Sequence, residues 1–353
     1  MIIDSNVFLN CFIDENIDFF TGVPDSLLKE FCWAVNRSAV IRHIVAGNEA
    51  QTIALAAGAA IGSGNPSVVY LQNSGLGNII NPLTSICSND VYGIPMVLLI
   101  GHRGYAADEP QHRLIGRSTV PILNVLDIEC YRLDENFKDT VKQAVQKTKE
   151  LNRPVAILTD HRIKWTNCLE PTTTSEGPDR YEVIKKIYHN VPEDSILVST
   201  CGLTSRELMY IHKSENRNLK ILPIVGGMGL ASALARGLSE YSTKRIYCLD
   251  GDGAQFMHLS SMLLSNKNIF HVVFNNGVHA SVGSHPTLGP KFEFHKLAKI
   301  SGYDTVKKVT MDNITEINLL TPGSVFFEIT VNDKQSSVDY RPDELLSYKN
   351  NVK

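Results

Sequence analysis

Short, uninterrupted apolar runs rich in β-branched residues recur along the sequence and alternate with segments of helical character. These runs lie at 40–46, 67–72, 95–101, 195–200, 219–225, 245–250, 270–275 and 325–330. A strand that is apolar at every position is buried on both sides, as in parallel sheets that helices cover on both faces. The sequence therefore predicts an α/β fold built from doubly wound parallel sheets.

A polar segment at 166–180, rich in Thr, Pro and Gly, divides the chain into two halves of similar size. With 353 residues, the chain is long enough for two domains that each bury a core. We therefore expect one domain at 1–165, a linker, and a second domain at 181–353. Ligands of open parallel sheets bind at the carboxyl ends of the strands, so functional residues should directly follow the predicted strands.

Composition and charge exclude several classes of protein. The net charge of -3 gives no general electrostatic reason to bind nucleic acid or an anionic membrane. The seven cysteines are scattered and contain no C-x-x-C pair, which argues for reduced thiols and against a disulfide framework or a structural zinc site. The apolar runs are too short to span a membrane, and the N-terminus lacks the basic residues of a secretory signal. We expect a soluble, cytoplasmic protein.

Two polar motifs follow consecutive predicted strands. Gly251–Gly253 comes after the strand at 245–250, and Asn275–Asn276 ends the next strand. If these strands are parallel neighbours, joined by a helix around 255–265, Asp252 and Asn276 lie at the same sheet edge within reach of one small cation. Carboxylate and amide oxygens suit Mg²⁺, which shares its coordination with substrate phosphates.

The same stretch has features that suit a phosphate group. Gly251 and Gly253 allow the backbone to approach a ligand closely, and a helix starting near Ala254 would offer free N–H groups to an anion. Two unrelated turns would also account for these residues, because Asn-Asn-Gly favours turns. From these residues alone, both interpretations remain open.

The two motifs together resemble the diphosphate motif of the thiamin-diphosphate-dependent decarboxylase family, in which Asn-Asn follows Gly-Asp-Gly by some two dozen residues. The resemblance implies thiamin diphosphate and Mg²⁺ as cofactors, with the ion held by Asp252, Asn276 and the carbonyl group of Val278. The intervening segment 254–274 has 21 residues, a few fewer than is usual in the family.

Further cofactor contacts follow from the same resemblance. Residues 226–229, Gly-Gly-Met-Gly, look like the family's Gly-x-Met-Gly. There the bulky side chain, here Met228, wedges between the two rings of the cofactor, and the carbonyl group of Gly226 would accept from its 4′-amino group. The remaining residues that the resemblance places at the cofactor are Asn73, Gly75, Gly251, Gly253 and Ala254.

Glu49 follows a predicted strand and opens the Ala-rich segment 48–64. One role of a glutamate in a first helical turn is to complement the helix dipole, without any part in catalysis. The family, however, needs a glutamate in this setting to control the tautomer of the cofactor's pyrimidine, which implies that Glu49 is catalytic.

In the family the pyrimidine-binding domain, which corresponds to 1–165 here, faces the diphosphate-binding domain of another subunit, which corresponds to 181–353. The resemblance therefore implies a homodimer or a dimer of dimers.

Four further stretches, 19–31, 71–86, 103–112 and 275–287, resemble the members of the family that decarboxylate 3-phosphonopyruvate to phosphonoacetaldehyde, in phosphonate biosynthesis. Sulfopyruvate or another 2-oxo acid, a carboligase reaction and a non-catalytic cofactor-binding subunit remain alternatives. A substrate with a carboxylate and a phosphonate needs charge-assisted donors, and 22–26, Gly-Val-Pro-Asp-Ser, looks like a helix start that could bind an anion. The expected substrate-binding residues are Asp25, Ser26, Arg103, His112, His279 and Ser281.

Overall fold

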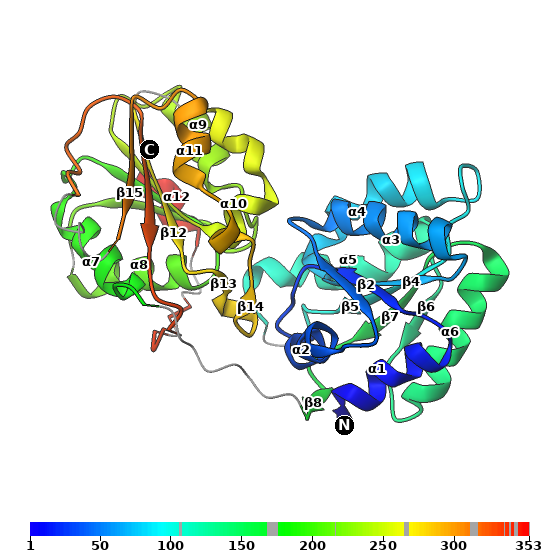
Figure 1. The fold of residues 1–353 in the computed structure, drawn as a ribbon. Helices are drawn as coiled ribbons and strands as arrows, with labels where there is room; N and C mark the ends of the chain where they lie inside the picture. The colour runs from blue at the N-terminus through cyan, green and yellow to red at the C-terminus, as the bar shows by residue number, and fades with distance from the viewer. Residues whose placement is uncertain are drawn as a thin grey trace. The chain divides into compact units, whose positions relative to one another are not determined.

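The computed structural model contains two compact units, residues 1–171 and 172–353, here the N-terminal and the C-terminal unit (Figure 1). It describes all residues except 106–107, 168–175, 216, 265–267, 311–316, 335, 339, 342–344 and 353. The boundary between the units falls inside the predicted linker, whose central part, 168–175, lies outside the described residues. None of the described helices is long and apolar enough to cross a membrane.

The N-terminal unit contains a parallel sheet of six strands with helices on both faces. Its strand order is β3 (Arg42–Val45), β2 (Phe19–Gly22), β4 (Ser67–Gln72), β5 (Met96–Gly101), β7 (Val155–Thr159) and β6 (Cys130–Arg132). An aromatic-rich core lies under α1 (Ser5–Asp14), α2 (Lys29–Arg37) and α6 (Phe137–Leu151). An aliphatic core lies under α3 (Glu49–Ser63), α4 (Leu76–Pro82), the π-helical η2 (Leu83–Cys87) and α5 (Pro110–Val125). Outside this sheet, β1 (Ile2–Asp4) pairs with β8 (Lys164–Thr166).

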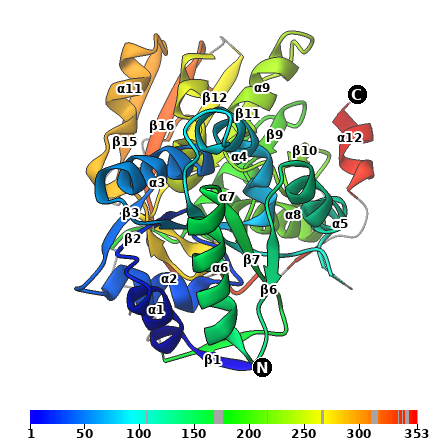
Figure 2. The same ribbon diagram turned by 90° about the vertical axis from the view of Figure 1, so that its right-hand side faces the viewer.

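The C-terminal unit contains a second six-stranded parallel sheet. Its strand order is β10 (Lys220–Pro223), β9 (Ile196–Ser199), β11 (Ile246–Gly251), β12 (Ile269–Asn275), β16 (Val325–Thr330) and β15 (Thr305–Val309). The helices α7 (Arg180–Asn190) and α8 (Leu203–Glu215) bury one core. The cores of the other face lie under α9 (Ala231–Ser239), η3 (Leu259–Leu264) and α11 (Phe294–Ile300). The last described helix, α12 (Leu346–Val352), lies beside β10 (Figure 2), and β13 (Val278–His279) pairs with β14 (His285–Pro286).

Both sheets have the same topology, with the strands of each unit lying in the order second, first, third, fourth, sixth, fifth. This confirms the predicted α/β fold with two doubly wound parallel sheets. In each sheet the first and third strands are neighbours, β2 with β4 and β9 with β11. A crevice opens at such a point because the loops that follow these two strands lead to opposite faces.

All eight predicted strands are present, and no end differs from its predicted position by more than two residues. Four other strands of the sheets were not expected: β2, β6, β7 and β15. β6 is only three residues long, and β15, at a sheet edge, contains two lysines, so neither has the apolar pattern of a buried strand. β2 ends in a glycine after only three other residues.

Tyr70 on β4 reaches across the neighbouring strand β2 to contact β3. Its hydroxyl group is hydrogen-bonded to Nε2 of His43 at 2.7 Å, and burial lowers the pKa of this imidazole to about 4. A Cβ atom on Gly22, in the strand between them, would lie 2.3 Å from ring atom Cδ2 of Tyr70. The missing side chain at Gly22 therefore makes room for the ring that joins the three strands.

We expect Gly22→Ala to lower the free energy of unfolding by about 1–3 kcal/mol, because the added methyl group overlaps the Tyr70 ring in a close-packed core. Gly58→Ala is the matched control. Gly58 is exposed on α3, and a methyl group there would have no described atom within 4 Å. This change should raise stability by about 0.5–1 kcal/mol through helix propensity. Urea denaturation followed by circular dichroism measures both effects, and equal effects of the two substitutions would contradict the proposed role of Gly22.

Candidate active site

Glu49 is the first residue of α3, as the sequence predicts. The helix start is held by Asn48, whose side chain accepts a hydrogen bond from the Gln51 N–H at 3.1 Å. The Glu49 carboxylate is buried, and its Oε2 accepts from Asn78 Nδ2 at 2.7 Å. A Cβ atom on Gly75 would lie 2.5 Å from Oε1, so the absence of a side chain there is required for this carboxylate position. Asn78, on α4, was missed because an uncharged residue in a helix gives no distinctive sequence signal.

A chain of hydrogen bonds links residues at the carboxyl ends of β2 and β4. Asp25, which follows β2, is completely buried, and its Oδ1 accepts from Gln72 Nε2 at 2.6 Å. Gln72 Oε1 accepts from the Ser74 hydroxyl at 2.8 Å. The same hydroxyl group is also paired with Nδ1 of His112 at 3.3 Å. The structure thus links two predicted substrate residues, Asp25 and His112. The intervening Gln72 and Ser74 were missed, although both lie in the family-like stretch 71–86.

Arg103, which follows β5, forms an ion pair that is mostly buried. Its Nε and Nη2 donate to Asp108 at 3.1 and 2.6 Å, and its Nη1 donates to the Ser26 hydroxyl at 3.1 Å. Burial raises the pKa of Asp108, but the bonds from Arg103 and from the Gly104 and Glu109 N–H groups outweigh it and hold that pKa well below its usual range. The pair therefore stays charged near neutral pH, and a bound anion would have to share Arg103 with Asp108.

Asn73 is buried and makes its hydrogen bonds inside the N-terminal unit. Its Nδ2 donates to the Arg103 carbonyl at 2.9 Å and to the Thr119 hydroxyl at 3.0 Å, while its Oδ1 accepts from the Arg103 N–H at 3.2 Å. The side chain thus positions the loop that carries Arg103. Its expected contact with the cofactor stays a prediction.

The expected helix start at 22–26 is wrong. The helix α2 begins later, at Lys29, and the preceding residues form a turn. The Leu27 N–H donates to Asp25 Oδ2 at 3.1 Å, and the Leu28 N–H donates to the Asp25 carbonyl at 3.1 Å. Asp25 therefore bonds the Leu27 and Leu28 N–H groups, and anion binding by this stretch stays a prediction.

We expect Asp25→Asn to stabilise the fold near pH 7.5 and to have little effect near pH 4. Burial raises the pKa of Asp25 to about 6 from 3.8. Between these two values the folded state keeps a proton that the unfolded chain releases, so stability falls as the pH rises. The loss of unfolding free energy caused by the ionised Asp25 is complete above about pH 6 and amounts to at most about 3 kcal/mol. Unfolding at both pH values measures it.

Asp18→Asn is the control for this experiment, because Asp18 forms an exposed pair with Arg42 at 3.0 Å. Exposed pairs of this kind contribute about 0–1 kcal/mol. The interpretation of Asp25 fails if Asp25→Asn destabilises the protein equally at the two pH values.

In the C-terminal unit, Asp252 is the first residue of α10 (Asp252–Met257), two residues before the expected start near Ala254. The helix has only six residues, because the chain leaves helical geometry at His258. The Asp252 carboxylate is buried and accepts a hydrogen bond from the Thr287 hydroxyl. Burial raises the pKa of Asp252 to about 6, opposed by this bond and by the N–H groups of Gly253 and Gly277. A carboxylate that is short of solvation in this way is suited to bind a cation.

The expected pairing of the two motif strands is confirmed, since β11 and β12 are parallel neighbours with Gly251 opposite Phe274. The asparagine beside Asp252 is Asn275. A Cβ atom on Gly289 would lie 2.3 Å from Asp252 Oδ2 and 2.5 Å from Asn275 Oδ1.

The two asparagines have different partners. Asn275 Nδ2 donates to Glu328 at 3.1 Å, which holds its amide in place. Asn276 Oδ1 accepts from the Val278 N–H at 3.2 Å within its own loop. The role of Asn276 as a ligand of Mg²⁺ stays a prediction.

The loop of residues 226–229 packs against α10. Gly229 has a positive φ of 80°, and a Cβ atom there would lie 2.5 Å from the Ala254 carbonyl oxygen. This contact brings the loop with Gly226 and the half-buried Met228 to the Gly-Asp-Gly motif. By contrast, a Cβ atom on Gly251 would have no described atom within 4 Å. The space beside Gly251 is therefore open to a ligand.

Two predicted substrate residues lie near these motifs. The ring of His279 packs on Gly253, where a Cβ atom would lie 2.7 Å from Nδ1, and desolvation lowers the pKa of this half-buried imidazole to about 4. Ser281 is exposed, and its hydroxyl oxygen would lie 3.3 Å from a Cβ atom on Gly202, in the loop after β9. Neutral His279 can donate or accept a hydrogen bond, but it brings no charge for an anionic substrate.

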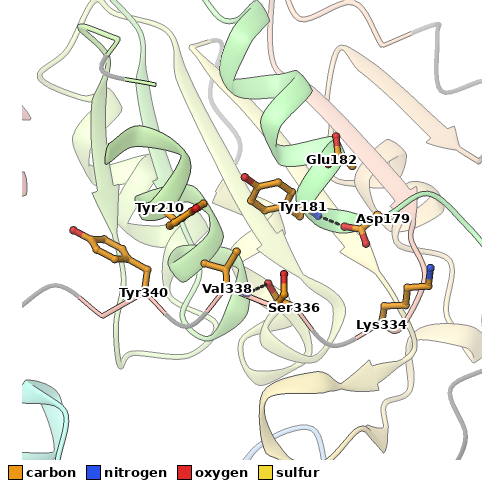
Figure 3. A pocket seen from close by; sticks show the side chains of 9 residues that line it. Asp179, Tyr181, Glu182, Tyr210, Lys334, Ser336, Val338 and Tyr340 are labelled. Carbon is orange, nitrogen blue, oxygen red and sulfur yellow. Dashed lines mark hydrogen bonds between the residues drawn. The ribbon is translucent and has the colours of Figure 1, made fainter. Parts of the chain in front are cut away.

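A groove of about 620 Å³ lies in the C-terminal unit beside the start of α7 (Figure 3). Tyr181, Tyr210 and Tyr340 line it, and Asp179 and Lys334 carry opposite charges on its wall. Asp179 also caps α7, because its Oδ1 accepts from the Tyr181 N–H at 2.8 Å. None of the described residues that line this groove belongs to the predicted site.

Both units match models of known domains. Residues 5–119 match the N-terminal TPP binding domain of the thiamine pyrophosphate enzymes, and residues 202–317 match the C-terminal TPP binding domain. Phosphonopyruvate decarboxylase from Streptomyces viridochromogenes is 29% identical over 84% of this chain and 79% of that protein. Sulfopyruvate decarboxylase subunit beta from Methanocaldococcus jannaschii is 35% identical over 38% of this chain and 72% of the subunit. Subunit alpha from Methanococcus maripaludis is 34% identical over 42% of this chain and 89% of the subunit.

The chain belongs to the thiamin-diphosphate-dependent decarboxylase family. Its two units correspond to the two cofactor-binding domains, which confirms the family inferred from the glycine motifs. The protein is therefore a decarboxylase of this family. Glu49, the expected catalytic glutamate, lies within the N-terminal domain match, and the Gly-Asp-Gly motif lies within the C-terminal domain match.

Proposed function

We propose that this decarboxylase converts 3-phosphonopyruvate to phosphonoacetaldehyde and CO₂, with thiamin diphosphate and Mg²⁺ as cofactors, in a cytoplasmic route of phosphonate biosynthesis. The observation that carries the substrate is the pair formed by Arg103 and Ser26 at the carboxyl ends of β5 and β2. Arg103 presents a mostly buried guanidinium beside the Ser26 hydroxyl group, which suits an anionic head group. The similarity to phosphonopyruvate decarboxylase supports the same choice.

Sulfopyruvate is the second candidate substrate, because two relatives are subunits of sulfopyruvate decarboxylase. Its sulfonate has the same tetrahedral oxygens as a phosphonate but one charge fewer. A carboligase reaction and a non-catalytic cofactor-binding subunit are less well supported. The buried and hydrogen-bonded Glu49 would serve no purpose in a non-catalytic subunit.

The residues around Glu49 fit the pyrimidine side of the cofactor. Thiamin diphosphate, when bound, supplies the electron sink that decarboxylation of a 2-oxo acid requires. Glu49 would share a proton with ring nitrogen N1′, and Asn78 would keep the carboxylate oriented through Oε2. Gly75 leaves the space that the other carboxylate oxygen occupies.

The residues around Asp252 fit the diphosphate side. The open space beside Gly251 can admit a phosphate group, and the buried Asp252 offers a carboxylate to the bridging Mg²⁺. Asn276 and the carbonyl group of Val278 would complete the protein ligands of the ion. The remaining contacts proposed for the cofactor are those of Gly226, Met228, Gly253 and Ala254.

We infer that the active protein is a homodimer or a dimer of dimers. The catalytic glutamate and the diphosphate motif lie in different units, and members of this family combine such domains from different subunits. The chain is also similar to proteins named as the alpha and beta subunits of one enzyme. Gel filtration with light scattering at catalytic concentrations would test the inference, which fails if the active species is monomeric.

Glu49→Gln should lower kcat by on the order of 10²–10⁴-fold, as for the loss of a positioned proton-transfer group, while cofactor binding is largely retained. Steady-state assays at saturating thiamin diphosphate, combined with titration of the cofactor by isothermal calorimetry, separate the two effects. Glu135→Gln, an exposed glutamate of the same unit, is the control. Near-normal turnover of Glu49→Gln would remove Glu49 from the proposed mechanism.

Phosphonopyruvate should be preferred over pyruvate by at least about 10³-fold in kcat/KM, because donors left unpaired in a buried site are costly. Sulfopyruvate should lie between them. Arg103→Ala should reduce turnover of phosphonopyruvate much more than any residual turnover of pyruvate, whereas Arg162→Ala, an exposed control, should not. A coupled assay of CO₂ release measures all three substrates side by side. Equal turnover of pyruvate and phosphonopyruvate would overturn the substrate assignment.

A further inference from the structure

Three side chains with metal-binding atoms lie together on one buried face of the sheet in the C-terminal unit. Cys248 and Asp250 belong to β11, and His271 belongs to β12 directly opposite Cys248. Residues two apart on a strand point to the same face, as do directly opposed residues on neighbouring strands. The ligand atoms of all three lie within 4.8 Å of one another, and all three residues are completely buried.

The inner polar atoms of this cluster make no hydrogen bonds to the described residues. Asp250 Oδ2 and His271 Nε2 are 3.8 Å apart, and neither makes a hydrogen bond to any described residue. Each buried polar atom left unpaired costs about 1–3 kcal/mol. A cation between these two atoms would satisfy both of them.

The outer atoms of the same side chains, in contrast, are held by hydrogen bonds. Asp250 Oδ1 accepts from the Gly251 N–H at 2.9 Å, and His271 Nδ1 is paired with the Tyr303 hydroxyl at 3.1 Å. When Nδ1–H donates to Tyr303, Nε2 keeps its lone pair and directs it into the cluster. Protein ligands of metals are typically supported in this way, with one atom on the metal and the other in a hydrogen bond.

We propose that Cys248, Asp250 and His271 bind a divalent transition metal of the zinc class, at a site distinct from the Mg²⁺ site proposed for Asp252. A thiolate, an imidazole and a carboxylate form a ligand set that zinc accepts and Mg²⁺ does not. A double positive charge also balances the thiolate and the carboxylate. Contraction of the 3.8 Å separation by about 0.5 Å would give the spacing expected on tetrahedral zinc.

The metal would join β11 to β12 immediately before the Gly-Asp-Gly motif, and so stabilise the sheet edge that carries Asp252. Because the cluster is completely buried, the ion is expected to enter during folding and to resist chelation afterwards. The proposal stands independently of the substrate, since it uses no residue of the anion-binding group.

The test uses the full chain, produced in cells grown in medium that contains zinc or, separately, cobalt. After prolonged dialysis against a chelator that removes Mg²⁺, elemental analysis should find one zinc ion per chain. The cobalt-loaded protein should show a thiolate-to-cobalt charge-transfer absorption in the near ultraviolet. Cys248→Ala should lose both the metal and this absorption.

Two variants are matched controls. Cys87→Ala removes another completely buried thiol, in the N-terminal unit, and should leave metal content and absorption unchanged. Asp252→Ala should keep the zinc while losing Mg²⁺ affinity, which separates the two sites. The proposal is overturned if wild-type protein retains no stoichiometric zinc or cobalt, as for a purely hydrogen-bonded cluster, or if the absorption persists in Cys248→Ala. Should Cys248→Ala fail to fold, the metal content and spectrum of the wild type still decide.

Discussion

The parallel pairing of β11 with β12 is the constraint on which the chemistry of the C-terminal unit depends. Its register places Gly251 opposite Phe274, so that Asp252 and Asn275 emerge together at the carboxyl edge of the sheet. The same register places Cys248 opposite His271 on a buried face of the sheet. A shift by one residue would turn every side chain of one strand to the other face and separate both groups. The two polar groups of this unit therefore share one structural cause.

The N-terminal unit uses the pairing of β2 with β4 in a corresponding way. Asp25, in the loop after β2, and Gln72, the last residue of β4, meet through a hydrogen bond of 2.6 Å. Asp25 is shielded from solvent and lies near Arg103 without bonding it directly. Burial therefore dominates, and the pKa of Asp25 rises to about 6. Asp108 bonds Arg103 through two nitrogen atoms, and its pKa falls instead. The pKa values of two carboxylates near one guanidinium thus shift in opposite directions, because Asp25 is more deeply buried and only Asp108 bonds the guanidinium directly.

Some site residues could be found by motif and others could not. Glu49 and Asp252 stand at abrupt transitions from strand to helix, which a sequence shows as a change of period beside a charged residue. Asn78 and Thr287 contact these two carboxylates, but each sits in an ordinary polar context, so only the three-dimensional contact reveals them. The expected helix start at 22–26 was wrong for a related reason. An aspartate near a helix start can bond the free N–H groups itself, and the sequence does not show whether it does.

The alternation of apolar strands with helices determined the α/β class and the presence of two domains, because burial of a strand on both faces demands that pattern. The sequence also determined the family, through glycines and polar residues at fixed positions after strands. Strand order, and with it the identity of neighbouring side chains, was decided only by the tertiary structure. The absence of a C-x-x-C pair argued against structural zinc, yet Cys248, Asp250 and His271 converge from two strands. Side chains on different strands meet through hydrogen-bond register, and a linear spacing rule carries no information about that register.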